Sequence, residues 1–100
     1  MTDRSLLTLI VPVSLEEVLV DWLLENAPEH GFCSFPVNGH SASHRGLTVA
    51  EQVSGRKRQM RFEVHAPDAE AQALVEGLKQ QFPGVGMHYW LTPLRDAGQV

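Results

Sequence analysis

The 100-residue chain has a single cysteine, Cys33, so no disulfide can form within one copy. A chain of this kind suits a reducing compartment, and we expect a cytoplasmic protein. Cys33 lies between Phe32 and Phe35 in an apparent strand, so we expect it to be a buried structural residue. Basic residues are also few: eight lysines and arginines stand against twelve acids, with a net charge of -4. Because nucleic-acid binders are normally basic, this balance argues against DNA or RNA as a partner.

Long apolar runs are missing as well. The run near the N-terminus covers only eight residues, 6–13, and is interrupted by Thr8 and Pro12. It is too short to span a membrane, and no small-residue cleavage site follows it as in a secretory signal. We therefore expect no direct membrane insertion. The length and the hydrophobic fraction of 43% fit a single domain over residues 1–100.

Catalytic motifs are absent from the sequence. It contains no G-x-S-x-G, no Walker loop, no G-x-G-x-x-G and no pair of carboxylates placed by a motif. The Gly84-Val85-Gly86 turn is too short to cradle a phosphate. We therefore expect a protein that is not an enzyme.

The first elements can be placed from periodicity. Residues 6–11 are apolar on both alternating faces, which is typical of a central strand. Ser14 and Glu17 form a capping-box pattern that predicts the start of a helix. Pro28 disfavours helical geometry just before it, so this helix should end near residues 26–27. Its apolar stripe consists of Leu15, Val18, Leu19, Trp22 and Leu23.

The remaining elements complete a known order. Residues 31–37 and 58–66 are expected to be strands, residues 68–82 a helix, and residues 86–94 a last strand. The order β-α-β-β-α-β predicts an α+β, ferredoxin-like domain, with two helices on one face of an antiparallel sheet. Trp90 falls on the other face. Because two helices cover only one face, we expect the other face to mediate self-association.

A polar loop over residues 38–58 separates the second and third strands. It is far longer than most connections in compact domains, and long loops commonly bind or regulate. Within it, Thr48 and Glu51 repeat the capping-box pattern and predict a helical turn over residues 48–53. Gly55 is expected to end this turn.

Two histidines in this loop, His40 and His44, are candidate ligands for a divalent metal such as zinc or copper. Two protein ligands alone would hold an ion weakly. A third would come from His88, Glu51, Cys33 or another subunit. The alternative is that both are solvated loop histidines.

The basic residues of the chain cluster at the end of the loop. Arginines bind phosphates or carboxylates through bidentate contacts, so Arg56 and Arg58, with Glu51, are candidate ligand-binding residues. The alternative is a solvated strand start that balances Glu51 and Glu63. The cluster consists of Arg56, Lys57, Arg58 and Arg61.

The order and spacing of four segments, rather than any one motif, resemble the PII-like proteins. These are small ferredoxin-like signalling trimers. The chain is still more similar to a bacterial family of unknown function that is related to PII and to divalent-cation tolerance proteins and is often found beside heavy-metal efflux systems. The segments are residues 15–24, 31–37, 46–56 and 88–90.

This resemblance implies a homotrimer, ligand sites in clefts between subunits, and residues 38–58 as the surface that contacts partners. It also implies a link to metal homeostasis, with a membrane transporter or efflux pump as a candidate partner. Two departures argue against nucleotide signalling of the usual PII kind. Residues 38–57 contain no tyrosine for modification, and the glycine- and lysine-rich loop that holds ATP phosphates shrinks to residues 82–86.

Two functional hypotheses follow. The first is a regulatory or sensor subunit that binds a small effector or a divalent metal and signals through residues 38–58. The second is a structural docking partner of a metal-efflux complex that binds no small ligand.

Overall fold

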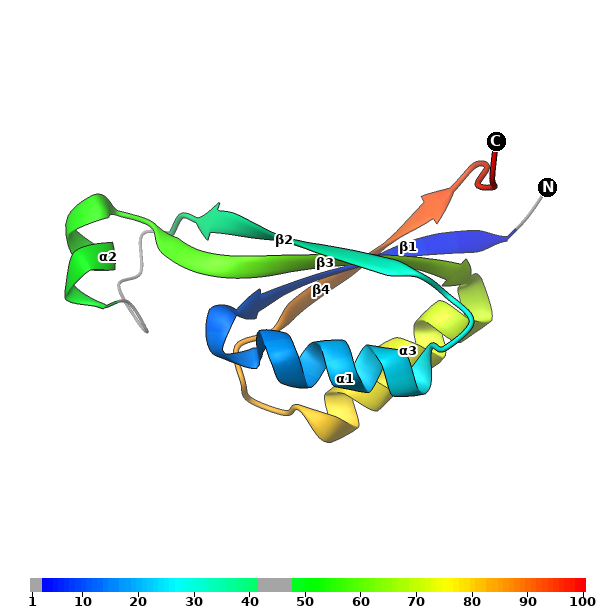
Figure 1. Ribbon diagram of the computed structural model, residues 1–100, viewed down its shortest axis with the longest axis horizontal. Helices are drawn as coiled ribbons and strands as arrows, with labels where there is room; N and C mark the ends of the chain where they lie inside the picture. The colour runs from blue at the N-terminus through cyan, green and yellow to red at the C-terminus, as the bar shows by residue number, and fades with distance from the viewer. Residues whose placement is uncertain (1–2, 42–47) are drawn as a thin grey trace.

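The computed structural model describes residues 3–41 and 48–100 and confirms the predicted order of elements (Figure 1). The short helix α2 corresponds to the helical turn predicted over residues 48–53, and the 3-10 turn η1 is an addition to the predicted order. None of the helices in the described part of the chain has the length and apolarity to cross a membrane. The elements are β1 (Arg4–Pro12), η1 (Val13–Leu15), α1 (Glu16–Asn26), β2 (Phe32–Gly39), α2 (Val49–Ser54), β3 (Lys57–Pro67), α3 (Asp68–Gln81) and β4 (His88–Leu94).

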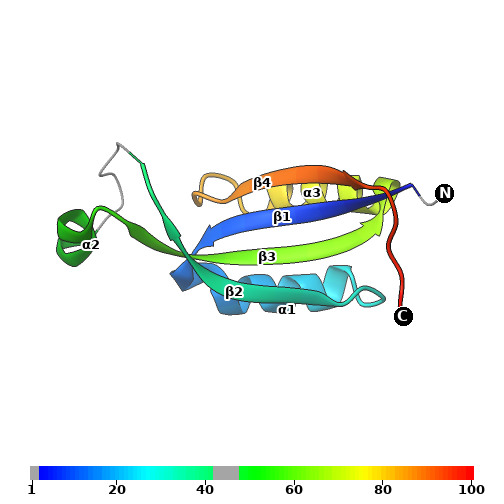
Figure 2. The same cartoon turned by 90° about the horizontal axis from the view of Figure 1, so that it is seen from above.

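The four strands form one antiparallel sheet in the order β2-β3-β1-β4 (Figure 2). Helices α1 and α3 lie together against one face of this sheet (Figures 1 and 2). This arrangement is the expected α+β, ferredoxin-like fold. We call the opposite face, away from the helices, the open face.

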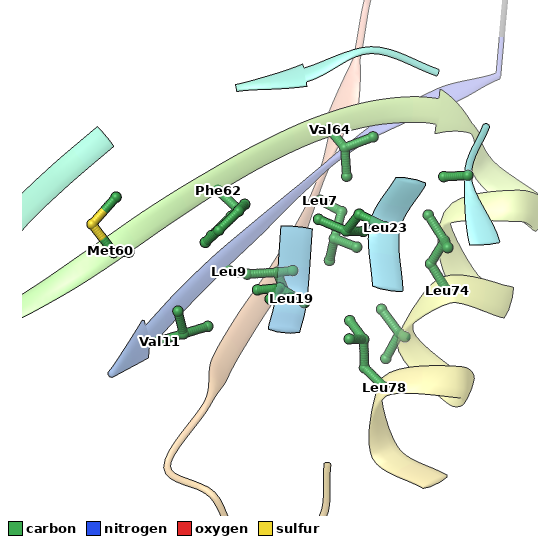
Figure 3. Close-up of a cluster of buried hydrophobic side chains, with 12 residues drawn as sticks. Leu7, Leu9, Val11, Leu19, Leu23, Met60, Phe62, Val64, Leu74 and Leu78 are labelled. Atoms are coloured by element: carbon green, nitrogen blue, oxygen red, sulfur yellow. The ribbon is translucent and has the colours of Figure 1, made fainter. Parts of the chain in front are cut away.

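Alternation along the strands separates the core from the open face. Leu7, Leu9 and Val11 of β1 are fully buried and point toward the helices (Figure 3). Leu9 lies opposite Phe62 of β3, which is also fully buried. The two helices complete the core with Leu19, Leu23, Ala71, Leu74, Val75 and Leu78.

The start of the first helix differs from the prediction. Residues Val13–Leu15 form the 3-10 turn directly after Pro12, and α1 begins only at Glu16. Ser14 therefore lies inside the turn, and α1 has no side-chain cap. The predicted Ser14–Glu17 capping box is wrong. Val18 is 46% exposed, so its assignment to the apolar stripe of α1 is wrong as well.

The two helices pack closely where α3 has a glycine. A Cβ at Gly77 would lie 2.9 Å from the indole ring of Trp22. Trp22 also makes an edge-on contact with Phe82, with the ring centroids 6.2 Å apart. Glycine costs helix stability in the middle of α3, but at this position it leaves room for the Trp22 ring.

Candidate functional site

An arm projects from the sheet between β2 and β3 (Figure 1). Strands β2 and β3 stay paired as far as Gly39 and Lys57, whereas β1 ends at Pro12, opposite Gln59. The hairpin therefore continues beyond the end of β1, and α2 lies on this projection, away from the termini (Figures 1 and 2). We call residues 38–41 and 48–58 the arm. The loop predicted over residues 38–58 thus includes ordered structure with its own helix.

Hydrogen bonds made by the backbone N–H and the carboxylate of Glu51 hold the arm together. The Thr48 hydroxyl accepts from the Glu51 backbone N–H at 3.1 Å, and Glu51 Oε1 accepts from the Thr48 N–H at 3.0 Å. This is the predicted capping box, and it is confirmed. Glu51 Oε2 also accepts from the Arg58 N–H at 2.7 Å, which links α2 to β3. Gly55 ends the helix with φ 72°, a left-handed conformation that favours glycine.

These bonds lower the pKa of Glu51 below its ordinary value of 4.5. The backbone N–H of Arg58 is the largest cause, followed by the N–H of Thr48. Both donors favour the charged carboxylate. The resulting stabilisation is present above the pKa of the unfolded chain and is lost as the pH falls through the lower pKa of the folded arm.

Glu51→Gln is expected to loosen α2 while the sheet stays intact. The amide replaces the carboxylate, so the charge-assisted bonds to Thr48 and Arg58 are lost or weakened. Hydrogen exchange at residues 48–58 should become faster at neutral pH, and acidification should change it less than in the wild type. Glu25→Gln, on the exposed side of α1, is the control and should leave the arm unchanged. Equal exchange in the wild type and Glu51→Gln would contradict this account.

Two hollows lie at the base of the arm. The first, of about 470 Å³, combines arm residues with open-face residues of the sheet, and we call it the root hollow. His40, Arg56 and Lys57 line it from the arm, and His88 and Trp90 line it from β4. The second, of about 660 Å³, is the arm hollow; its lining includes Asn38, Thr48, Glu51, Arg56 and Arg58.

The predicted site residues therefore divide between the two hollows. His40 and His88, both proposed as metal ligands, share the root hollow. Glu51 and Arg58, both proposed as ligand-binding residues, share the arm hollow, and Arg56 lines both. The third histidine, His44, lies outside the described residues.

The predicted site omitted most of the residues that line the root hollow, among them Lys57, Gln59 and Trp90. Lys57 and Gln59 are two positions apart on β3, so strand alternation places them on one face together with Arg61. That alternation was available in the sequence. The approach of Trp90 on β4 to the arm depends on strand order, which periodicity does not supply.

Within the described residues, no group of three or more His, Cys, Asp or Glu side chains is placed to hold a metal ion. His40 and His88, the two described histidines of the proposed metal site, line one hollow. Among the described residues, no third side chain is placed to complete a metal site with them. Metal binding that includes His44 stays a prediction.

The open face carries a cluster around Arg61. Its guanidinium carbon lies 5.9 Å from the ring centroid of Phe35 and 5.6 Å from that of Trp90, and it forms an ion pair with Glu63 at 3.0 Å. Phe35 and Trp90 are 39% and 41% exposed. The Thr8 hydroxyl, on the same face, is fully buried, and no partner among the described residues bonds it. Two exposed aromatic rings close together are unusual on the solvent-exposed surface of a monomer. A buried hydroxyl without a hydrogen-bond partner is also uncommon.

The structure corrects the prediction for Cys33. It is a free cysteine on the open face and is exposed in the single chain. The physical reason is its position on β2. Cys33 pairs with Glu63, which faces away from the helices, whereas Phe32 pairs with the buried Val64.

The four-stranded sheet, the two helices on one face and the projecting arm define a PII-like fold. The whole chain, residues 1–100, matches the family described as "Protein of unknown function (DUF3240)". The chain belongs to the DUF3240 family. No protein of curated function matches it.

Solved structures agree with this assignment. A DUF3240 family protein from Shewanella baltica is 25% identical, with a TM-score of 0.79 over 100% of this chain and 99% of that one. CPII, a nitrogen regulatory PII-like protein from Thiomonas intermedia, is 15% identical, with a TM-score of 0.71 over 97% of this chain and 96% of that one. The divalent cation tolerance protein CutA from Archaeoglobus fulgidus is 10% identical, with a TM-score of 0.70 over 96% and 88%. The last two likenesses show the fold alone.

Proposed function

We propose that this chain is a non-enzymatic, PII-like regulatory or sensor subunit of the cytoplasm. A small ligand would bind at the base of the arm, and the arm would present the bound state to a partner protein. The observation that carries this proposal is the root hollow, because arm residues and sheet residues line it together. A ligand that contacts both would favour one arrangement of the arm over another, which is the requirement for signalling by population shift.

The subunit is proposed to act as a homotrimer assembled through the open face. The exposed rings of Phe35 and Trp90 support a second copy on this face. A second copy on this face would bury the two exposed rings. The PII-like fold supports the same arrangement, since the resemblance to PII implies a trimer.

The ligand is proposed to be a small effector or a divalent metal, in a pathway of heavy-metal homeostasis. The structure of CPII is bound to ADP, AMP and bicarbonate, and the CutA structure is that of a divalent cation tolerance protein. ATP binding of the usual PII kind is not part of the proposal, because residues 82–86 form only a short turn between α3 and β4.

Hydrogen exchange of the full chain tests the sensor function. Zinc, copper and ATP would be added in turn, with binding followed by native mass spectrometry. A ligand that is taken up should slow exchange at residues 48–58 and leave the buried segment of α3 unchanged. Uptake without any change in the arm would contradict the sensor function.

The metal form of the proposal makes its own prediction. The double variant His40→Ala with His44→Ala should abolish binding of zinc or copper, because two of three proposed ligands are lost. His30→Ala is the matched control, since His30 pairs with Glu70 at 2.8 Å on the helix side of the molecule. Isothermal titration with each metal measures the change. Unchanged affinity in the double variant would remove His40 and His44 from the site.

A second candidate function is a structural docking partner of a membrane metal-efflux complex. The projecting arm supports it, because a helix held away from the sheet is available for contact with another protein. In this case metals and nucleotides would leave the isolated protein unchanged. A pull-down with the purified chain would recover the pump or its adaptor, and Glu51→Gln would weaken the capture.

A further inference from the structure

The two long helices carry most of the acidic residues of the chain. Eight of the twelve aspartates and glutamates lie in residues 16–30 and 68–81, where Lys79 is the only lysine or arginine. Most of these acids are exposed. Lys79 is already engaged, because its Nζ lies 3.7 Å from Glu76 and 5.4 Å from the ring centroid of Tyr89. The helix side of the molecule is therefore strongly negative.

A hollow of about 400 Å³ opens in this acidic surface, between the end of α1 and α3, and we call it the helix groove. Its apolar lining includes Trp22, Ala73, Leu74 and Gly77. The glycine helps to keep the groove in this shape, because a Cβ at Gly77 would lie 2.9 Å from the indole ring of Trp22. A larger residue there would displace the ring that lines the groove.

Carboxylates lie beside this apolar lining. Glu29, in the turn after α1, and Glu70, on α3, both line the helix groove, and none of the described residues that line it is a lysine or arginine. One oxygen of Glu70 lies 2.8 Å from Nε2 of His30, while the Glu70 side chain stays 55% exposed. A carboxylate has two acceptor oxygens, so Glu70 can still accept a further cationic donor.

Acidic side chains alone would indicate only a solvated helix face. The helix groove adds an indole ring and apolar surface beside the carboxylates, and Val18 and Leu24 of α1, 46% and 58% exposed, add further apolar surface on the same helix. A matching ligand has positive charge next to an apolar group. Lysine or arginine beside a large apolar side chain offers this combination, and a cation near an indole ring gains further attraction.

We propose that the helix groove is a docking site for a basic segment of a partner protein, in which lysines or arginines flank a large apolar side chain. The apolar side chain would pack against Trp22, and the basic side chains would pair with Glu29 and Glu70. The helices lie on the side of the sheet opposite the open face, so the groove stays accessible when copies assemble through that face (Figure 1). The inference goes beyond the proposed sensor function, because this contact surface does not involve the arm.

Three synthetic peptides of equal length test the proposal on the full chain. The first has a phenylalanine between pairs of lysines, the second has glutamates in place of the lysines, and the third has a serine in place of the phenylalanine. NMR spectra follow the backbone amides at physiological salt, which screens long-range attraction. The first peptide should shift the signals of residues 22–30 and 70–77. The glutamate peptide should leave them unchanged, and the serine peptide should bind at least about 10-fold more weakly.

A pair of double variants shows whether the charge of the groove itself matters. Glu29→Gln with Glu70→Gln should bind the first peptide about 3- to 10-fold more weakly, the usual effect of two partly exposed ion pairs. Glu17→Gln with Glu25→Gln is the matched control, because it removes two exposed charges of α1 that do not line the groove. The control should bind as the wild type does.

A positive charge placed in the groove gives an independent test that removes no existing ion pair. Ala73 is exposed on α3 and lines the groove, so Ala73→Lys should fold and should repel the first peptide. Gln80→Lys adds the same charge at an exposed position of α3 that does not line the groove, and it should bind nearly as well as the wild type.

The proposal is overturned if the first peptide leaves the signals of residues 22–30 and 70–77 unchanged, or if the serine peptide binds equally well. Wild-type binding by Ala73→Lys would also overturn it. So would an equal loss in the two double variants, because the attraction would then come from the whole helix surface. None of these outcomes bears on the sensor function, which is measured at the arm.

Discussion

Replacing Trp90 by aspartate is expected to split the oligomer into folded monomers. Trp90 lies on the open face and is 41% exposed in the single chain. The guanidinium of Arg61 lies over the rings of both Trp90 and Phe35. If a second copy covers this face, the substitution removes a large apolar surface and places a carboxylate in the interface. Even beside the Arg61 guanidinium, desolvation of the carboxylate and loss of the apolar contact together cost about 3 kcal/mol or more, which weakens association by about two orders of magnitude.

Sedimentation of Trp90→Asp beside the wild type measures this change. Leu24→Asp is the matched control, because Leu24 is 58% exposed on α1, on the helix side of the sheet. The control should keep the oligomeric mass of the wild type. An unchanged mass for Trp90→Asp would show that the open face around Trp90 is not the contact surface.

Leu9→Ala is expected to destabilise the protein by about 2–5 kcal/mol. Leu9 is fully buried at the centre of β1, between Phe62 of β3 and Tyr89 of β4. The truncation loses the transfer free energy of the removed atoms and leaves a cavity in a closely packed core. For a domain of ordinary stability this is a large part of the total free energy of unfolding.

Urea unfolding at one fixed protein concentration measures the loss, since association would make stability depend on concentration. Leu24→Ala makes the same chemical change at an exposed position of α1, and its free energy of unfolding should stay within about 0.5 kcal/mol of the wild type. Equal stability of the two variants would contradict the packing described around β1.

Much of the fold could be predicted from local patterns. The alternation of Met60, Phe62 and Val64 placed these residues on the core face, and all three are buried. The Thr48–Glu51 capping box identified α2 in a loop that otherwise has no periodicity. Both signals depend only on residues close together in the chain, so they can be recognised in the sequence without the tertiary structure.

The failures have physical causes of two kinds. The Ser14–Glu17 pattern competed with a 3-10 turn that starts directly after Pro12, and the turn displaced the helix start to Glu16. Cys33 was expected to be buried because its neighbours are apolar, but it shares an alternating face with Glu63 rather than with the core. In both cases the local residue pattern favoured one conformation or burial, but the geometry of the adjoining strand decided the outcome.

The candidate site was harder to predict than the fold, because its residues come from separate elements. His40 directly follows β2, Arg56 directly precedes β3, and His88 and Trp90 belong to the last strand, β4. They meet in one hollow only because β2 and β3 extend past the end of β1. The sequence identified three of these residues, His40, Arg56 and His88, but it assigned the histidines to a metal site and Arg56 to a separate ligand site, whereas the structure places all three in one hollow.

Native mass spectrometry of the purified full chain tests the central claim most directly, that copies of this PII-like subunit assemble through the open face. The account predicts a dominant species of three chains, each of 11.1 kDa. A second spectrum after Trp90→Asp should show single chains. A wild type that is monomeric at micromolar concentration would contradict the claim, because the exposed rings of Phe35 and Trp90 would then have no covering copy.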